Sequence, residues 1–77
     1  MSNEFQVAFR SVEEISDFVN LANQYPVEMD LSRGKYVVDA KSIIGMLNLG
    51  IHNELNLIVH GDMTTCLRQA IDTFVVA

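Results

Sequence analysis

The sequence predicts an α+β fold in two layers, an open-faced sandwich in which helices cover one face of a four-stranded antiparallel sheet. Four short segments alternate apolar and polar residues at the two-residue period of a strand with one buried face. Three other segments repeat apolar residues at the i, i+3, i+4 spacing of a helix with one buried stripe. Their order along the chain is strand, helix, strand, strand, helix, strand, helix. Packing the helix stripes against the apolar face of the sheet buries both, so two layers are sufficient.

The first strand and the first helix are expected over 5–9 and 12–23. Residues 5–9 alternate apolar and polar side chains. Ser11 and Glu14 have the spacing of a capping box, in which the serine and glutamate side chains each accept a backbone N–H at the start of a helix. Pro26 cannot continue a helix, so this helix ends before it.

The second and third strands are expected over 27–31 and 36–38, joined as a hairpin. Residues 32–35 between them have the composition of a tight turn, in which Gly34 is suited to a positive φ. The same alternation predicts the fourth strand over 55–59.

A short second helix is expected between Ser42, as its N-cap, and Gly50, as its stop. Gly45 lies inside this helix, where it costs about 1 kcal/mol relative to alanine. Either close packing or a flexible helix would account for a glycine at this position.

The third helix is expected to begin after Asp62, which can cap it, and to run close to the C-terminus. Its apolar stripe consists of Met63, Cys66, Leu67, Ala70, Ile71, Phe74 and Val75. Because Cys66 lies on this stripe, we expect it in the core.

Length and charge limit the classes of function. A chain of 77 residues is expected to form one domain over 1–77. Ten acidic residues and five basic residues give a net charge of −5. The basic residues are scattered along the chain and are Arg10, Arg33, Lys35, Lys41 and Arg68. Without a basic stripe, we expect no binding to nucleic acid and none to a membrane.

The remaining composition indicates a cytoplasmic protein that is not a conventional enzyme. The single cysteine cannot form an internal disulfide, which fits a reducing compartment. Neither a signal peptide nor an apolar run of about 20 residues is present. His52 and His60 have no supporting cluster of metal ligands, and no base is paired in sequence with Ser11. We therefore expect no metal site, no cofactor and no catalytic residue.

One segment carries a family resemblance. Residues 41–51 read Lys-Ser-Ile-Ile-Gly-Met-Leu-Asn-Leu-Gly-Ile and resemble the regulatory-serine segment of HPr, the histidine-containing phosphocarrier of the bacterial sugar phosphotransferase system. Residues 5–9, 25–31 and 54–61 are similar to further HPr strands. The resemblance implies an HPr-like domain over 1–77 with sheet order 1-4-2-3 and three helices on one face.

The sequence departs from HPr at the phosphocarrier motif Gly-x-His-x-Arg-Pro-Ala. Ser11 falls at the histidine position, and Glu13 and Glu14 fall at the arginine and proline positions. A serine phosphoester is a poor donor in a relay that depends on a labile phosphoramidate, and the two glutamates repel a phosphate. Arg10 alone does not restore the motif. The resemblance therefore implies a degenerate phosphocarrier site comprising Arg10, Ser11, Glu13 and Glu14.

The second helix carries the candidate functional residues. Ser42 is expected to cap the helix, and the resemblance implies that it is also a regulatory phosphorylation site. Since a two-turn helix cannot bury all of its apolar residues, some of them are expected to form a docking site, as HPr does for kinase and regulator partners. Ile44 and Leu47 are its expected centre, with Met46 as a further member.

These observations favour a non-catalytic regulatory or protein-binding module related to the phosphotransferase system. Its expected partners are a kinase or a transcription regulator, and its expected state is a monomer or a weak dimer. One alternative is a phosphocarrier that uses His52 or His60, neither of which is expected near the usual carrier site. Another alternative is a structural domain that dimerises through the sheet or the second helix.

Overall fold

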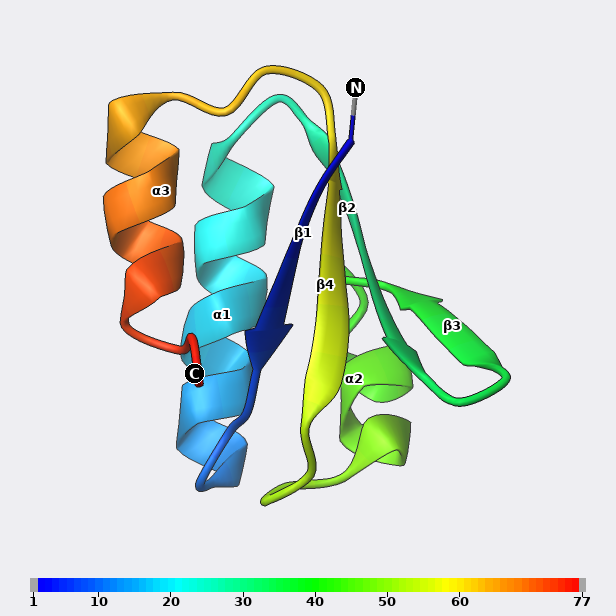
Figure 1. Ribbon diagram of the computed structural model, residues 1–77. Coiled ribbons are helices and arrows are strands. Elements are labelled where there is room, and N and C mark those ends of the chain that lie inside the picture. The colour runs from blue at the N-terminus through cyan, green and yellow to red at the C-terminus, as the bar shows by residue number, and fades with distance from the viewer. Residues whose placement is uncertain (1, 77) are drawn as a thin grey trace.

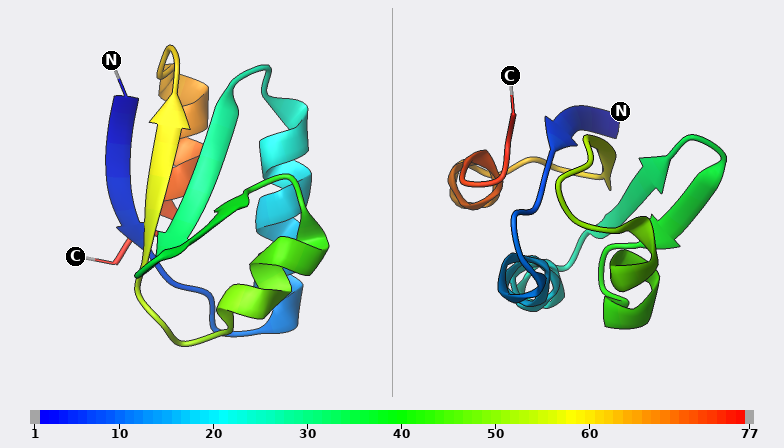
Figure 2. Two further views of the ribbon diagram at one scale, coloured as in Figure 1. Left: turned by 90° about the vertical axis from the view of Figure 1, so that its right-hand side faces the viewer. Right: turned by 90° about the horizontal axis from the view of Figure 1, so that it is seen from below.

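The computed structural model describes residues 2–76 as a four-stranded antiparallel sheet with helices packed against one face (Figure 1). The elements are β1 (Ser2–Val7), α1 (Val12–Gln24), β2 (Glu28–Arg33), β3 (Tyr36–Asp39), α2 (Ile43–Leu49), β4 (Leu55–His60) and α3 (Thr65–Asp72). The strand order is β1-β4-β2-β3, as the sequence resemblance implied. Figure 2 shows α1, α2 and α3 on the same side of the sheet. The predicted fold class and element order are therefore confirmed.

Strand pairing determines where β1 ends. Its six residues pair with β4 from Ser2 opposite His60 to Val7 opposite Leu55. The strand therefore begins and ends earlier than the predicted 5–9, and Phe9 lies beyond its last pair. The ring of Phe9 is nevertheless buried, because the chain after β1 turns towards the helices.

Three aromatic rings join this end of the sheet to the helices. The ring centroid of Phe9 lies 5.3 Å from that of Phe18 in α1 and 5.5 Å from that of Phe74 near the C-terminus. The centroids of Phe18 and Phe74 are 5.2 Å apart, with the rings nearly perpendicular. These are favourable edge-to-face distances for buried aromatic residues. The cluster holds the loop between β1 and α1 against the core.

The core is one cluster of apolar side chains from both layers. The buried side chains of β2 and β4 alternate with more exposed ones, as expected for a sheet with one covered face. The largest fully buried residues are Phe9, Phe18, Ile15, Met29, Leu31, Met46, Leu55, Leu57, Leu67 and Ile71. Within residues 2–76, no helix has the length and apolar character needed to cross a bilayer.

Two glycines have identifiable roles. Gly34 in the hairpin turn has a φ of +59°, as the turn prediction required. A Cβ on Gly45 in α2 would lie 3.0 Å from the Cβ of Val38 in β3. Close packing of α2 on β3, one of the two expected explanations, therefore accounts for Gly45.

The prediction for the start of α3 was wrong in two details. The N-cap is Thr64, whose Oγ1 accepts the backbone N–H of Leu67 at 3.1 Å, and Asp62 lies before it in the loop. In this register Leu67 and Ile71 face the core. Cys66 immediately precedes Leu67, about 100° away around the helix, so it is exposed and not part of the core.

Candidate functional site

Helix α2 begins at Ser42, and the contacts of this residue are local. The Ser42 Oγ accepts the backbone N–H of Gly45 at 3.3 Å, and the Ser42 backbone N–H donates to the Asp39 carbonyl at 3.0 Å. The carboxylate of Asp39 accepts the backbone N–H of Lys41 at 2.8 Å. Ser42 is exposed. Its predicted role as N-cap is confirmed, and its hydroxyl lies at an accessible helix terminus.

The apolar residues of α2 divide into a buried and an exposed set. Met46 and Leu49 are 1% and 3% exposed, because α2 packs against both α1 and β3. Ile43, Ile44 and Leu47 are 38%, 72% and 43% exposed. We refer to Ile44 and Leu47 as the α2 apolar patch. The expectation that Met46 contributes to a docking surface was wrong, since its side chain belongs to the core.

The N-terminus of α1 holds the residues that the resemblance implied to be a degenerate carrier site. The Ser11 Oγ accepts the backbone N–H of Glu14 at 3.2 Å, which is one half of a capping box. The Glu14 carboxylate accepts the backbone N–H of Arg10 at 3.0 Å, so the reciprocal bond goes to Arg10 and not to Ser11. The Arg10 Nε lies 3.8 Å from the Glu14 carboxylate in an exposed ion pair. The cation in this loop is therefore already opposed by a carboxylate.

This arrangement is poorly suited to holding a phosphoryl group. Ser11 supplies no imidazole, and its hydroxyl oxygen already accepts a helix N–H. Glu13 and Glu14 add two carboxylates in the first helical turn. Carboxylates are favourable near a helix N-terminus, but they repel a second anion there.

His52 lies beside this loop, contrary to the expectation that neither histidine would be near it. The backbone N–H of His52 donates to the Phe9 carbonyl at 2.7 Å, which joins the α2–β4 loop to the β1–α1 loop. His52 is exposed and has a φ of +64°. Local sequence carries no signal for this proximity, because the two loops are more than 40 residues apart.

His60 lies at the opposite end of the sheet, as expected. It is paired with Ser2 at the start of β1, whereas the β1–α1 loop follows the end of β1 at Val7. The His60 Nε2 is 2.9 Å from the Asp30 carboxylate on the neighbouring strand. His60 is therefore a surface residue with a structural partner.

The fold is that of a small α+β protein with a four-stranded antiparallel sheet. The helices α1 and α2 each begin at a serine N-cap, Ser11 and Ser42. A scan against family models matches residues 13–75 to the PTS-HPr family, described as "PTS HPr component phosphorylation site". This chain belongs to that family, the HPr phosphocarrier family of the phosphotransferase system. The match begins at Glu13 and so does not include Ser11.

Solved structures support the same fold. A phosphocarrier protein HPr from Bacillus anthracis is 21% identical, with a TM-score of 0.76, and the match covers 99% of this chain and 96% of that chain. HPr-C-His from Thermoanaerobacter tengcongensis is 20% identical, with a TM-score of 0.75 and coverage of 97% and 90%. Crh, a catabolite repression protein from Bacillus subtilis, is 25% identical, with a TM-score of 0.62 and coverage of 86% and 75%. A search of curated protein sequences found no match.

Proposed function

We propose that this HPr-family chain is a regulatory, protein-binding module that does not carry phosphoryl groups at the usual site. The observation that carries the proposal is the arrangement at the N-terminus of α1. There Ser11 acts as the N-cap, and the Glu14 carboxylate accepts the Arg10 N–H and lies beside the Arg10 guanidinium. A carrier needs a nucleophile with a labile phosphorylated form and cations that bind the phosphoryl group. Ser11 is not such a nucleophile, and Arg10, the cation of this loop, is paired with the Glu14 carboxylate.

Ser42 is the proposed regulatory phosphorylation site. Its hydroxyl is exposed at the start of α2, so a kinase has access to it. A phosphate there gains from the adjacent helix N–H groups and is opposed by the nearby Asp39 carboxylate. The retained sequence around Ser42 supports this assignment through its resemblance to the regulatory segment of HPr.

The α2 apolar patch is the proposed contact surface. Ile44 is two residues from Ser42, and both patch residues expose apolar area on a helix of an otherwise acidic protein. A phosphate on Ser42 would therefore place a negative charge at the edge of the contact. The relative Crh, whose structure is described as that of a catabolite repression protein, supports a regulatory partner such as a kinase or a transcription regulator.

Intact-mass spectrometry after two incubations tests the proposal. With ATP and HPr kinase we expect the gain of one phosphate, which is absent in Ser42→Ala. With phosphoenolpyruvate and the first phosphotransferase of the system we expect no gain. A kinase reaction that leaves the mass unchanged would remove Ser42 phosphorylation from the proposal.

Pull-down with purified regulator, before and after phosphorylation, tests the contact surface. The double variant Ile44→Asp, Leu47→Asp should lose binding, because two charges replace exposed apolar side chains. Val37→Asp is a control for adding one charge at an exposed apolar position elsewhere, since Val37 is exposed on β3 opposite Ser32, on the uncovered face of the sheet. Equal binding by the double variant and the control would show that the patch is not the contact.

A second candidate function is phosphoryl transfer through His52. The observation that favours it is the 2.7 Å backbone hydrogen bond from His52 to Phe9, which places His52 beside the loop that corresponds to the carrier-histidine loop of HPr. An acid-labile phosphate from phosphoenolpyruvate that is lost in His52→Ala and kept in His60→Ala would establish this function. It would also overturn the proposal that the chain lacks carrier chemistry.

A further inference from the structure

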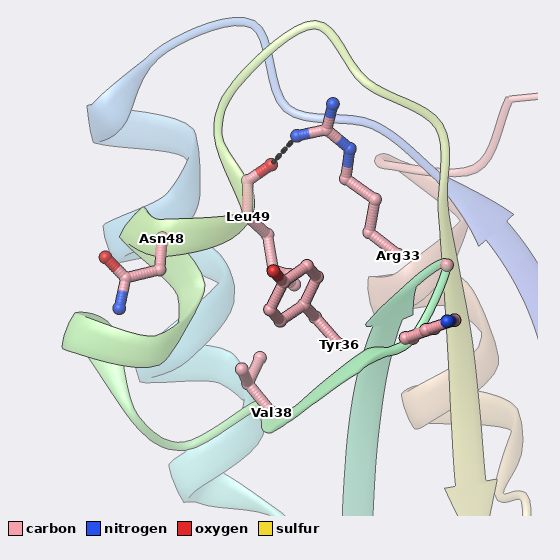
Figure 3. Close-up of a pocket in the computed structure, with 7 residues that line it drawn as sticks. Arg33, Tyr36, Val38, Asn48 and Leu49 are labelled. Atoms are coloured by element: carbon pink, nitrogen blue, oxygen red, sulfur yellow. Dashed lines mark hydrogen bonds between the residues drawn. The ribbon is translucent and has the colours of Figure 1, made fainter.

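A groove opens between the β2–β3 hairpin and the C-terminal half of α2 (Figure 3). Its volume is about 750 Å³, within the range of small-molecule sites. The lining residues are Arg33, Gly34, Lys35, Tyr36, Val38, Asn48 and Leu49. None of them belongs to the degenerate carrier site or to the α2 apolar patch.

The groove exists because the sheet extends beyond the helix that covers it. Arg33 pairs with Tyr36, and two residues further in each strand Leu31 pairs with Val38. By strand alternation, Arg33 and Tyr36 therefore lie on the same face as the buried Leu31. Tyr36 nevertheless remains 74% exposed, since α2 does not reach over it. An aromatic side chain on the helix-facing side of the sheet is therefore left largely exposed.

The charge of the groove is opposite to that of the whole chain. Two of the five basic residues line it, and none of the ten acidic residues does. Arg10 and Arg68 each lie within 4 Å of a carboxylate, at 3.8 Å and 3.6 Å. Over residues 2–76, Arg33 has no carboxylate within ion-pair distance. No carboxylate therefore competes with an anionic ligand for the Arg33 guanidinium.

The Arg33 guanidinium is also positioned. Its Nη1 donates to the Leu49 carbonyl at 3.1 Å, and Figure 3 shows the side chain extending to that carbonyl. This bond uses one of five N–H donors and offsets the negative end of α2. The remaining donors are available to an anion, and Lys35 adds a second positive charge on the groove lining.

We propose that this groove binds a small organic phosphate that carries a ring. The phosphate would pair with Arg33 and Lys35, since two cations match its charge and guanidinium donors match its oxygens. The ring would pack on Tyr36 and Val38, which together with Leu49 form the apolar part of the lining.

Titration of the isotope-labelled protein with phenyl phosphate, followed by amide chemical shifts, tests the proposal. We expect saturable shifts at Gly34, Tyr36 and Leu49. Inorganic phosphate, which has the charge alone, and benzyl alcohol, which has the ring alone, should each bind at least about fivefold more weakly. Lack of saturation at these amides up to about 10 mM phenyl phosphate would overturn the proposal.

Two pairs of variants separate the groove from general charge attraction. Arg33→Gln should weaken phenyl phosphate about fivefold or more, whereas Arg68→Gln, with the same change in net charge, should change it less than about twofold. Lys35→Gln and Lys41→Gln form a second pair that leaves the Arg33–Leu49 bond intact. Equal losses within both pairs would overturn the site. Tighter binding of hexaglutamate than of phenyl phosphate would overturn the small-molecule ligand in favour of an acidic peptide.

Discussion

At position 11 the hydroxyl group has a structural partner, because the Ser11 side chain caps α1. Ser11 accepts the backbone N–H of Glu14, while the Glu14 side chain accepts that of Arg10. Capping chemistry of this kind is local, so the capping box and the helix from Val12 were predictable from sequence. The shift of the reciprocal bond to Arg10 was not predictable, because it depends on how the loop enters the helix.

Replacing Ser11 with alanine tests the capping role. Ser11→Ala should lower the free energy of unfolding by about 1 kcal/mol, because the Glu14 N–H loses its acceptor. Urea denaturation followed by circular dichroism measures this change. Phosphorylation of Ser42 by ATP and kinase should be unaffected, and a parallel loss of that phosphorylation would contradict the separation of the two sites.

The division of α2 into buried and exposed residues gives a second prediction at this scale. Met46→Ala should cost about 2–5 kcal/mol, since it opens a cavity in the core. Leu47→Ala should cost less than about 1 kcal/mol, since much of Leu47 already contacts water. Denaturation midpoints of the two variants check the difference. Similar losses would contradict the orientation of α2 described here.

At the scale of elements, α2 shows which features of a helix its sequence specifies. Ser42 and Gly50 bound the helix as predicted, because cap residues act through their own backbone neighbours. Its orientation was not predictable. Five of its seven residues are large and apolar, so the helix has no polar face, and its packing on α1 and β3 decides that Met46 is buried.

The contact between α2 and β3 predicts a coupling between Gly45 and Val38. Gly45→Ala alone should not stabilise the protein, because the gain of about 1 kcal/mol in helix propensity is offset by the contact of the new Cβ with Val38. In a Val38→Gly background, which removes the Val38 Cβ, the same substitution should be more favourable by about 1 kcal/mol. A double-mutant cycle from urea denaturation measures this coupling. Additive effects would show that the strand shifts to accommodate the methyl group.

At the scale of the whole molecule, the hydrophobic pattern and the family resemblance predicted the fold better than they predicted the functional sites. Alternating strands and apolar helix stripes specified the two layers, and the segment 41–51 implied the strand order. The neighbourhood of His52 and Phe9, and the groove beside Arg33, come from contacts between distant segments. No local pattern encodes them, so the sequence did not indicate either.

The distribution of acidic residues over the uncovered sheet face predicts a salt-dependent stability. Asp30 and Asp39 lie directly opposite each other on β2 and β3, a destabilising like-charge pair. Asp39→Asn keeps an oxygen for the Lys41 N–H and should stabilise the protein by about 0.5 kcal/mol at low salt. The gain should disappear at about 1 M salt. Asp62→Asn, in an exposed loop, is the control, and an equal gain there would indicate net charge as the cause.

The same acidic face bears on oligomeric state. Two such faces would repel each other, so we expect a monomer at low salt, with a weak dimer forming only when charges are screened. Light scattering at two protein concentrations and two salt concentrations measures the mass. A dimer that persists at low salt and low concentration would indicate association through another surface, such as the α2 apolar patch.

The position of β1 has a consequence for the order in which the chain is synthesised. This strand lies between β4 and the C-terminal segment, where Val7 bridges Val75 and the Val76 N–H donates to the Gln6 carbonyl at 2.8 Å. Both neighbours follow β1 in the chain and are translated after it. About 50 residues separate β1 from β4, which at about 5–20 residues per second leaves the nascent strand unpaired for roughly 3–10 s. Since β4 is the strand that joins β1 to the rest of the sheet, β1 stays unpaired until β4 is made, and a nascent chain that stalls before β4 exposes β1 to other partners.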